Sequence, residues 1–152
     1  MKPDRSSRPA GPQDLTARTH RTTSVFVADD DRDFRDLARV ALSAAGYEVI
    51  MAADGGEALE RLAALVDAHT PLPDVLVLDF VMPRLSGLGV LGALCSLGRV
   101  PPTLVITGFA DPSVDTFARN LGAFRVLRKP FNDDELCAAV AEAVASRAPA
   151  RQ

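Results

Sequence analysis

The sequence is poor in the side chains that bind zinc or form disulfides, with two cysteines and two histidines among 152 residues. Cys95 and Cys137 fall within helical patterns and form neither a CxxC pair nor a ligand cluster with His20 or His69. This spacing argues against a zinc site and against a disulfide framework. We therefore interpret the cysteines as reduced thiols and the histidines as surface residues.

Long apolar runs are missing as well. No run approaches the roughly 18 residues that a transmembrane helix needs, and the N-terminus lacks the apolar region of a secretory signal. We therefore expect a cytoplasmic location and no membrane partner. The net charge is −3 and the arginines are scattered, so direct nucleic-acid binding is not expected. A GxxxxGK[ST] loop is absent too, which argues against ATP binding of the P-loop kind.

The composition indicates one folded domain with a tail at each end. Residues 1–22 are rich in Pro, Gly, Ser, Thr and Arg and lack a periodic apolar pattern, so we predict that they are disordered. A second disordered tail is predicted for residues 148–152. The hydrophobic fraction of 47% is ample for one apolar core in residues 23–147.

Within that domain, short apolar runs alternate with helical patterns. The runs cover residues 24–28, 47–51, 74–78, 103–106 and 124–127, and Phe124 is expected to pack in the core. Amphipathic segments with apolar residues at i, i+3, i+4 and i+7 follow each run. Strands that alternate with helices predict an α/β fold. We expect a doubly wound, five-stranded parallel sheet of order 2-1-3-4-5 with five helices.

The ends of the predicted helices carry capping residues. Asp111 precedes a proline at a first helical position, and two pairs have capping-box spacing: Asp54 with Glu57, and Asn132 with Glu135. Glycines at positions 46 and 122 are placed to end two of the helices. These signals support the helix assignments independently of the apolar pattern.

Polar side chains gather where the predicted strands end. Strand one runs into Asp29, Asp30 and Asp31, strand three into Asp79, strand four into Thr107 and strand five into Lys129. Each residue alone is explained by a turn, a helix cap or a solvated surface, and capping is the simpler role for Asp31. The carboxyl ends of parallel strands share one sheet edge, however, so at least three carboxylates should meet there. Their repulsion, about 4 kcal/mol per pair at 4 Å, calls for positive charge.

Lys129 supplies one positive charge, and a divalent cation would supply the rest. The available ligands are hard oxygens, which favour Mg²⁺, with Mn²⁺ as the alternative. A carboxylate in such a site can attack phosphorus and form an aspartyl phosphate. Phosphoryl transfer depends mainly on charge neutralisation and positioning, which the cation, Lys129 and the Thr107 hydroxyl would provide.

Four segments in order resemble the CheY-like receiver domain of two-component response regulators. They are VFVADDDRD from Val25, PDVLVLDFVMP from Pro73, LVITG from Leu104 and GAFRVLRKPF from Gly122. The resemblance covers about residues 24–146. It implies that Asp79 accepts the phosphoryl group, that Asp30 binds the metal directly, and that Asp29 binds it directly or through a water. Val81 would offer its backbone carbonyl to the metal.

The resemblance also implies a switch. Thr107 would be the switch hydroxyl, Lys129 would pair with the phosphoryl group, and the Lys129–Pro130 bond would be cis. The family often carries an aromatic residue three positions before the lysine, coupled to the threonine. Here that position is Val126, so an aromatic side-chain flip is impossible. How phosphorylation would be relayed to the partner surface is therefore not determined by the sequence.

The implied function is a signalling module, with no enzymatic turnover beyond its own phosphorylation and dephosphorylation. Its partners would be a histidine kinase or histidine phosphotransfer protein and a downstream protein, with a homodimer through the last helix–strand–helix face as a further expectation. A stand-alone receiver is the direct interpretation. The alternatives are a receiver from a larger DNA-binding regulator or hybrid kinase, and a receiver that works without phosphorylation. A haloacid-dehalogenase-like phosphatase would need a second aspartate at position 81, which is valine.

Overall fold

The computed structural model describes residues 21–147, in which strands and helices alternate throughout. The elements are β1 (Ser24–Ala28), α2 (Arg32–Ala44), β2 (Glu48–Ala52), α3 (Gly55–Asp67), β3 (Val75–Asp79), α4 (Gly87–Leu97), β4 (Thr103–Thr107), α5 (Pro112–Asn120), β5 (Arg125–Arg128) and α6 (Asp133–Ser146). The disorder predicted for residues 1–22 and 148–152 falls, apart from residues 21 and 22, outside the described residues. Among the described helices, none combines the length and apolar character that crossing a bilayer requires.

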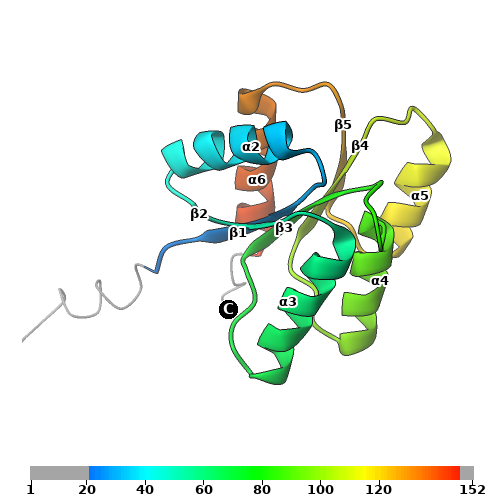
Figure 1. Ribbon diagram of the computed structural model, residues 1–152. Helices are drawn as coiled ribbons and strands as arrows, with labels where there is room; N and C mark the ends of the chain where they lie inside the picture. Colours follow the sequence, from blue (N-terminus) through cyan, green and yellow to red (C-terminus); the bar gives the residue numbers. More distant parts are fainter. Residues whose placement is uncertain (1–20, 148–152) are drawn as a thin grey trace, which may run out of the picture.

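The five strands form one parallel sheet of order β2-β1-β3-β4-β5, which confirms the predicted topology (Figure 1). In register, Val27 of β1 lies between Met51 of β2 and Val77 of β3. Every residue of β1, β3 and β4 is buried. Near-continuous apolar strands are what a parallel sheet covered on both faces needs.

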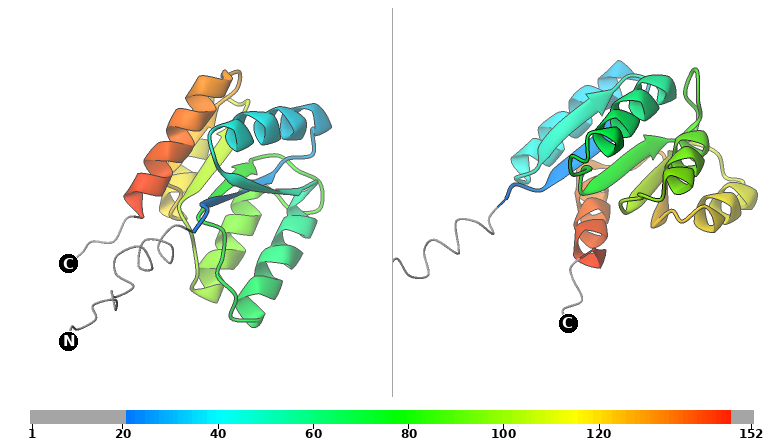
Figure 2. Two further views of the ribbon diagram at one scale, coloured as in Figure 1. Left: turned by 90° about the vertical axis from the view of Figure 1, so that its left-hand side faces the viewer. Right: turned by 90° about the horizontal axis from the view of Figure 1, so that it is seen from below.

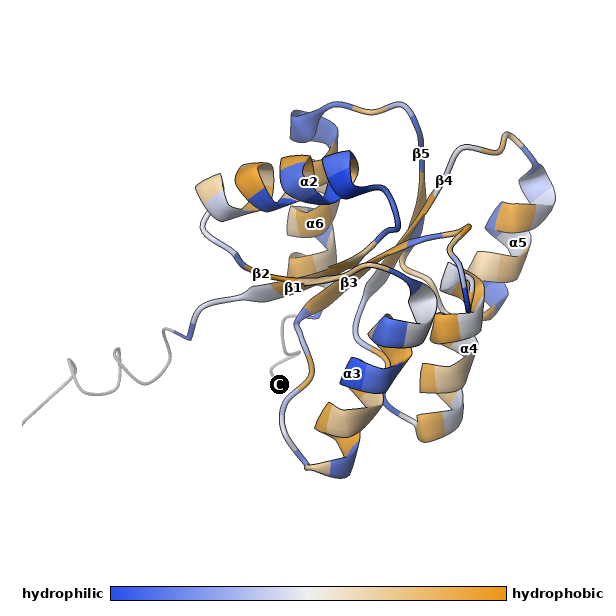
Figure 3. Ribbon diagram, in the orientation of Figure 1, coloured by the Kyte–Doolittle hydropathy of each residue, from blue (hydrophilic) through white to orange (hydrophobic). Residues whose placement is uncertain are grey.

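Helices cover both faces of the sheet. Helices α2 and α6 lie on one face, and α3, α4 and α5 lie on the other (Figures 1 and 2). Alternate strand residues serve the two layers: Val25 and Val27 pack with α2 and α6, whereas Phe26 and Ala28 pack with α3 and α4. The apolar residues of the strands therefore lie between the helix layers, as the hydropathy colours of Figure 3 show.

The predicted caps are present, with one difference. Asn132 and Glu135 form a complete capping box at the start of α6. At α3 the Asp54 carboxylate accepts the Glu57 N–H at 2.8 Å, but the Glu57 carboxylate accepts the N–H of Ala53, one residue before the cap. The start of α3 is thus held by a pair of contacts that spans one residue more than a capping box.

Four of the five strand ranges differ by one residue from the sequence analysis, and the differences in β3 and β5 concern Asp79 and Phe124. β3 begins at Val75 and includes Asp79, which pairs with Ile106 of β4. β5 begins at Arg125, and Phe124 precedes it with 39% of its surface exposed. The expectation that Phe124 packs in the core is therefore wrong. Its N–H still donates to the Thr103 carbonyl at 2.8 Å, but the residue lies beside the edge strand of the sheet, where its side chain is exposed.

Candidate functional site

Four of the predicted site residues meet at one edge of the sheet because their strands run parallel. Asp29 follows β1, Asp79 ends β3, Thr107 ends β4 and Lys129 follows β5. The β1, β3 and β4 positions are nearly sealed from solvent, with Asp29 0%, Asp79 7% and Thr107 1% exposed. The fold thus buries two carboxylates and a hydroxyl side by side.

Asp30 completes an acidic cluster with Asp29 and Asp79. One carboxylate oxygen from each of the three lies within 4.8 Å of the others, and only Asp30 is exposed. Three hard oxygen donors at this spacing fit a divalent cation, and one of them faces solvent where an ion would arrive. The acidic cluster is therefore consistent with a divalent metal site.

Lys129 provides the positive charge on the protein side of the cluster. Its Nζ lies 3.4 Å from Asp29 Oδ2 and 3.7 Å from Asp79 Oδ1. The ammonium also lies 5.2 Å from the centre of the Phe34 ring, a cation–π distance that helps to hold the chain over the site. The Lys129–Pro130 peptide bond is cis.

Two of the carboxylates in the cluster, Asp29 and Asp79, have a raised pKa. Burial first, and then the negative charge of Asp29, raise the pKa of Asp79 to about 6, while Lys129 opposes the shift. Burial also raises the pKa of Asp29, against the Asp31 N–H and the Lys129 ammonium. The site therefore holds more negative charge than one lysine can neutralise.

Backbone contacts fix the Asp29 end of the cluster. Asp29 Oδ1 accepts the Asp31 N–H at 2.9 Å, and the Asp29 carbonyl accepts a hydrogen bond from Arg35 at 2.7 Å. Asp31 itself caps α2 by accepting the N–H groups of Asp33 and Phe34, so its simpler predicted role is the observed one. Asp31 points its carboxylate into the helix start and lies outside the acidic cluster.

The Thr107 hydroxyl already has a partner. Its Oγ1 accepts the Phe109 N–H at 2.9 Å, within the loop that leads from β4 to α5. A hydroxyl that accepts one hydrogen bond keeps its own proton free to donate. Thr107 can therefore offer that proton to an oxygen bound at Asp79.

Arg128, directly before Lys129, links the same loop to α5. Its guanidinium donates to the carbonyl of Phe109 and, at 2.8 Å, to the carboxylate of Asp115. A continuous set of contacts therefore runs from Thr107 through Phe109 and Arg128 to α5. Val126, two residues earlier on β5, packs with the apolar cluster under α4 and α5.

Two residues of this site escape the sequence analysis. The apolar pattern places Phe34 only on a face of the first helix, and nothing in the sequence singles out Arg128. Neither type carries a signal of its own, because phenylalanines in helices and arginines on edge strands are common. Val81, expected to offer its carbonyl, lies in the loop after β3 with its side chain 55% exposed.

Chemically, the edge of the sheet holds a buried nucleophilic carboxylate, oxygen donors for a cation, an ammonium and a hydroxyl. Groups of this kind suit transfer of a charged group to Asp79, because each can neutralise or hold an oxygen of that group.

The chain matches the family model described as "Response regulator receiver domain" over residues 25–141. It is 44% identical over 114 residues to the response regulator MprA of Mycobacterium ulcerans, a match that covers 75% of this chain and 47% of that protein. The chain therefore spans about half the length of the curated relatives it matches.

Solved receiver structures have the same fold. The receiver domain of the Francisella response regulator 1452 superposes with a TM-score of 0.74 at 28% identity, covering 84% of this chain and all of that one. The receiver domain of the response regulator NarL from Mycobacterium tuberculosis superposes with a TM-score of 0.71 at 34% identity, covering 83% and 98% of the two chains.

Proposed function

Since the chain belongs to the family of response regulator receiver domains, we propose that it accepts a phosphoryl group on Asp79. A receiver is a phosphoacceptor signalling module rather than an enzyme, and it implies a cognate histidine kinase. The donor would be that kinase or a histidine phosphotransfer protein. The phosphorylated form would present a changed face, made by α5, β5 and α6, to a downstream protein or to a second copy of the chain.

The observation that carries this proposal is the position of Asp79 within the cluster. Its carboxylate is the one that ends the central strand β3 and lies 3.7 Å from the Lys129 ammonium. Asp29 is fully buried, with its Oδ1 held by the Asp31 N–H, and Asp30 is exposed. An attack on phosphorus by an Asp79 oxygen would form a mixed acyl phosphate, and the bond from phosphorus to the donor nitrogen would break.

The donor set fits Mg²⁺ and also Mn²⁺. Asp30 and Asp79 would bind the ion directly, Asp29 directly or through a water, and Val81 through its carbonyl. When bound, the ion would supply the positive charge that the phosphoryl oxygens need. The chain's own contribution would be the Lys129 ammonium, 3.7 Å from Asp79 Oδ1, and the Thr107 hydroxyl, which would donate to a phosphoryl oxygen. Both groups are fixed by backbone bonds, since the Lys129 N–H donates to the Thr107 carbonyl at 2.8 Å.

The direct test is phosphorylation by a small donor. We expect the chain incubated with acetyl phosphate and Mg²⁺ to gain the mass of one phosphoryl group in intact-mass spectra. Asp79→Asn should gain none, while Asp67→Asn, at an exposed position on α3, should behave as the wild type. An unmodified wild-type chain would contradict the proposal and favour a receiver that works without phosphorylation. A phosphoryl group that survives Asp79→Asn would contradict it by placing the acceptor at another residue.

A switch without the aromatic residue would run through the loop after β4. A phosphoryl group on Asp79 would draw the Thr107 hydroxyl towards it and strain the Phe109 contact. Arg128 holds the carbonyl of Phe109 and the carboxylate of Asp115 together. Movement of the loop would therefore be passed to α5 by a charged contact.

We expect Arg128→Ala to weaken this relay without preventing ligand binding at Asp79. Beryllofluoride, which mimics a phosphoryl group, should still shift the amide resonances of Asp79 and Thr107. The shifts of the α5 amides in the same ¹H–¹⁵N spectra should fall to about half or less, because a charge-assisted bond of about 1.5–3 kcal/mol no longer ties α5 to the loop.

Arg125→Ala is the matched control, since Arg125 lies on the same strand but pairs with Glu142 of α6 at 2.7 Å. It should leave the α5 response intact. Equal α5 shifts in Arg128→Ala and the wild type would refute the relay. Loss of all shifts in every protein would instead refute phosphoryl acceptance itself.

A further inference from the structure

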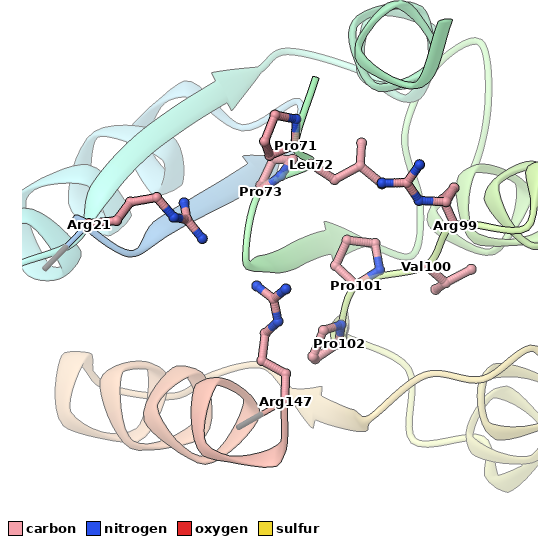
Figure 4. A pocket seen from close by; sticks show the side chains of 9 residues that line it. All are labelled: Arg21, Pro71, Leu72, Pro73, Arg99, Val100, Pro101, Pro102 and Arg147. Atoms are coloured by element: carbon pink, nitrogen blue, oxygen red, sulfur yellow. The ribbon is translucent and has the colours of Figure 1, made fainter. Parts of the chain in front are cut away.

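A cavity lies at the edge of the sheet where the strands begin, opposite the edge that carries Asp79. Its volume is about 320 Å³, and three arginines from distant parts of the chain line it with four prolines. Figure 4 shows the side chains of Arg21, Arg99 and Arg147 extending towards the cavity, from before β1, after α4 and after α6. This edge is separated from Asp79 by the length of β3, so it has no part in the phosphoryl site.

The Asp74 carboxylate pairs with two of these arginines, and both of its oxygens accept hydrogen bonds. Asp74, 4% exposed, accepts the Ser24 N–H on Oδ2 at 2.8 Å. Its Oδ1 accepts bonds from Arg21 at 2.8 Å and from Arg147. Burial alone raises the pKa of Asp74, but the Ser24 N–H and the two guanidinium groups hold that pKa below its usual value. Arg21 and Arg147 pair with this carboxylate, and Arg99 lines the same cavity, so the three guanidinium groups and Asp74 together carry an excess of two positive charges.

Two of the proline carbonyls beside the cavity already accept hydrogen bonds from the protein. The Pro101 carbonyl accepts the Thr103 hydroxyl at 2.8 Å, and the Pro102 carbonyl accepts the Leu76 N–H at 2.9 Å. Within residues 21–147 no ion pair involves Arg99. The cavity is therefore lined by three guanidinium groups, one of which has no ion-pair partner among the described residues, and this is the character of an anion site.

We propose that this cavity binds a small oxyanion of phosphate chemistry that carries at least two negative charges. Guanidinium groups bind phosphate oxygens in a bidentate manner, and three of them on different elements can surround one anion. The volume lies at the low end of small-molecule pockets, which suits a pyrophosphate or a small phosphate ester better than a dinucleotide. Arg99 should contribute most to binding the anion, because Arg21 and Arg147 already form ion pairs with Asp74.

Inorganic pyrophosphate is the probe for the test, added to the full chain at fixed pH and ionic strength in buffer freed of divalent ions. We expect saturable shifts of the amide resonances of Leu72, Arg99 and Val100. Arg99→Ala should raise the Kd by about tenfold or more, as the loss of a charge-assisted bidentate contact implies. Arg119→Ala removes one exposed charge from α5 and should leave the Kd unchanged.

Three further measurements distinguish a specific phosphate site from other causes of binding. A phosphate monoester such as glycerol phosphate should bind the same residues, and Asp79→Asn should bind pyrophosphate as the wild type does. Shifts that do not saturate, or equal Kd values in Arg99→Ala and Arg119→Ala, would reduce the effect to diffuse charge attraction and overturn the proposal. A triglutamate peptide that binds as tightly as pyrophosphate would overturn the phosphate class in favour of an acidic protein segment.

Discussion

Asp79→Asn is expected to stabilise the metal-free protein, raising the free energy of unfolding by about 1–3 kcal/mol above pH 7. The carboxylate is 7% exposed and lies in a cluster with two others. Its pKa is raised from 3.8 to about 6, and every tenfold gain in proton affinity corresponds to about 1.4 kcal/mol of preference for the neutral form. Asparagine has nearly the same shape and carries no charge, so the substitution removes the repulsion and keeps the packing.

The pH dependence follows from the raised pKa of Asp79. A folded-state pKa above the unfolded value means that the folded wild type binds the proton more tightly, so its stability falls as the pH rises from about 4 to about 6. Asparagine does not titrate. The advantage of Asp79→Asn should therefore be near zero at pH 4, grow through this window and stay constant above it.

Urea unfolding at several pH values in divalent-free buffer measures this difference directly. Asp67→Asn, at an exposed position, serves as the control and should change little at any pH. Added Mg²⁺ should narrow the gap, since ligand binding to the folded wild type stabilises it. A wild type that equals or exceeds Asp79→Asn in metal-free stability at pH 8 would contradict the description of the cluster as electrostatically strained.

Gly87→Ala is expected to destabilise the protein by about 2–3 kcal/mol, as overpacking against a rigid neighbour does. A Cβ at Gly87 would lie 2.3 Å from the carbonyl oxygen of Asp79, so α4 or the end of β3 must move. The Gly87 N–H also donates to the carbonyl of Phe80, the residue after Asp79, at 3.1 Å. The displacement should therefore slow phosphoryl uptake from acetyl phosphate as well as lower the urea midpoint.

Gly92→Ala is the matched control in the same helix. There the nearest atom to an added Cβ is Leu121 Cδ2 at 4.0 Å, an ordinary contact. Alanine in a helix interior is favoured over glycine by about 0.5–1 kcal/mol, so this variant should be more stable than the wild type. Destabilisation of both variants to a similar degree would show that α4 rejects side chains generally, and that Gly87 has no special place beside Asp79.

The topology was predictable because it rests on patterns that the core enforces. Buried parallel strands must be apolar along their whole length, and β1, β3 and β4 are. The strand boundaries were less predictable. Hydropathy places Asp74 in the third strand and leaves Asp79 out, whereas pairing with Ile106 includes Asp79 and starts the strand at Val75. Backbone pairing depends on the neighbouring strand, which a local pattern does not contain.

The site was predictable as a set of residues and not as a set of contacts. Asp29, Asp79, Thr107 and Lys129 could be placed together because each stands at a strand end and strand ends share an edge. The contact of Lys129 with Phe34 joins residues almost a hundred positions apart. The Arg128 contacts depend on the path of the loop after β4. Such side-chain partners follow from three-dimensional packing, which residue type and spacing do not specify.

The central place of β3 in the sheet has a consequence for fluctuations of the folded state. β3 has neighbours on both sides, whereas β5, which leads into Lys129, has a neighbour on one side only. Amide hydrogen exchange should therefore be slowest along β1 and β3 and faster along β5, because edge elements open at lower free energy than the core. An opening limited to β5 would carry Lys129 away and leave Asp29 and Asp79 in position. Asp79 would thus keep its position during such a local opening, and Lys129 would be the residue of the site that exchanges between two environments.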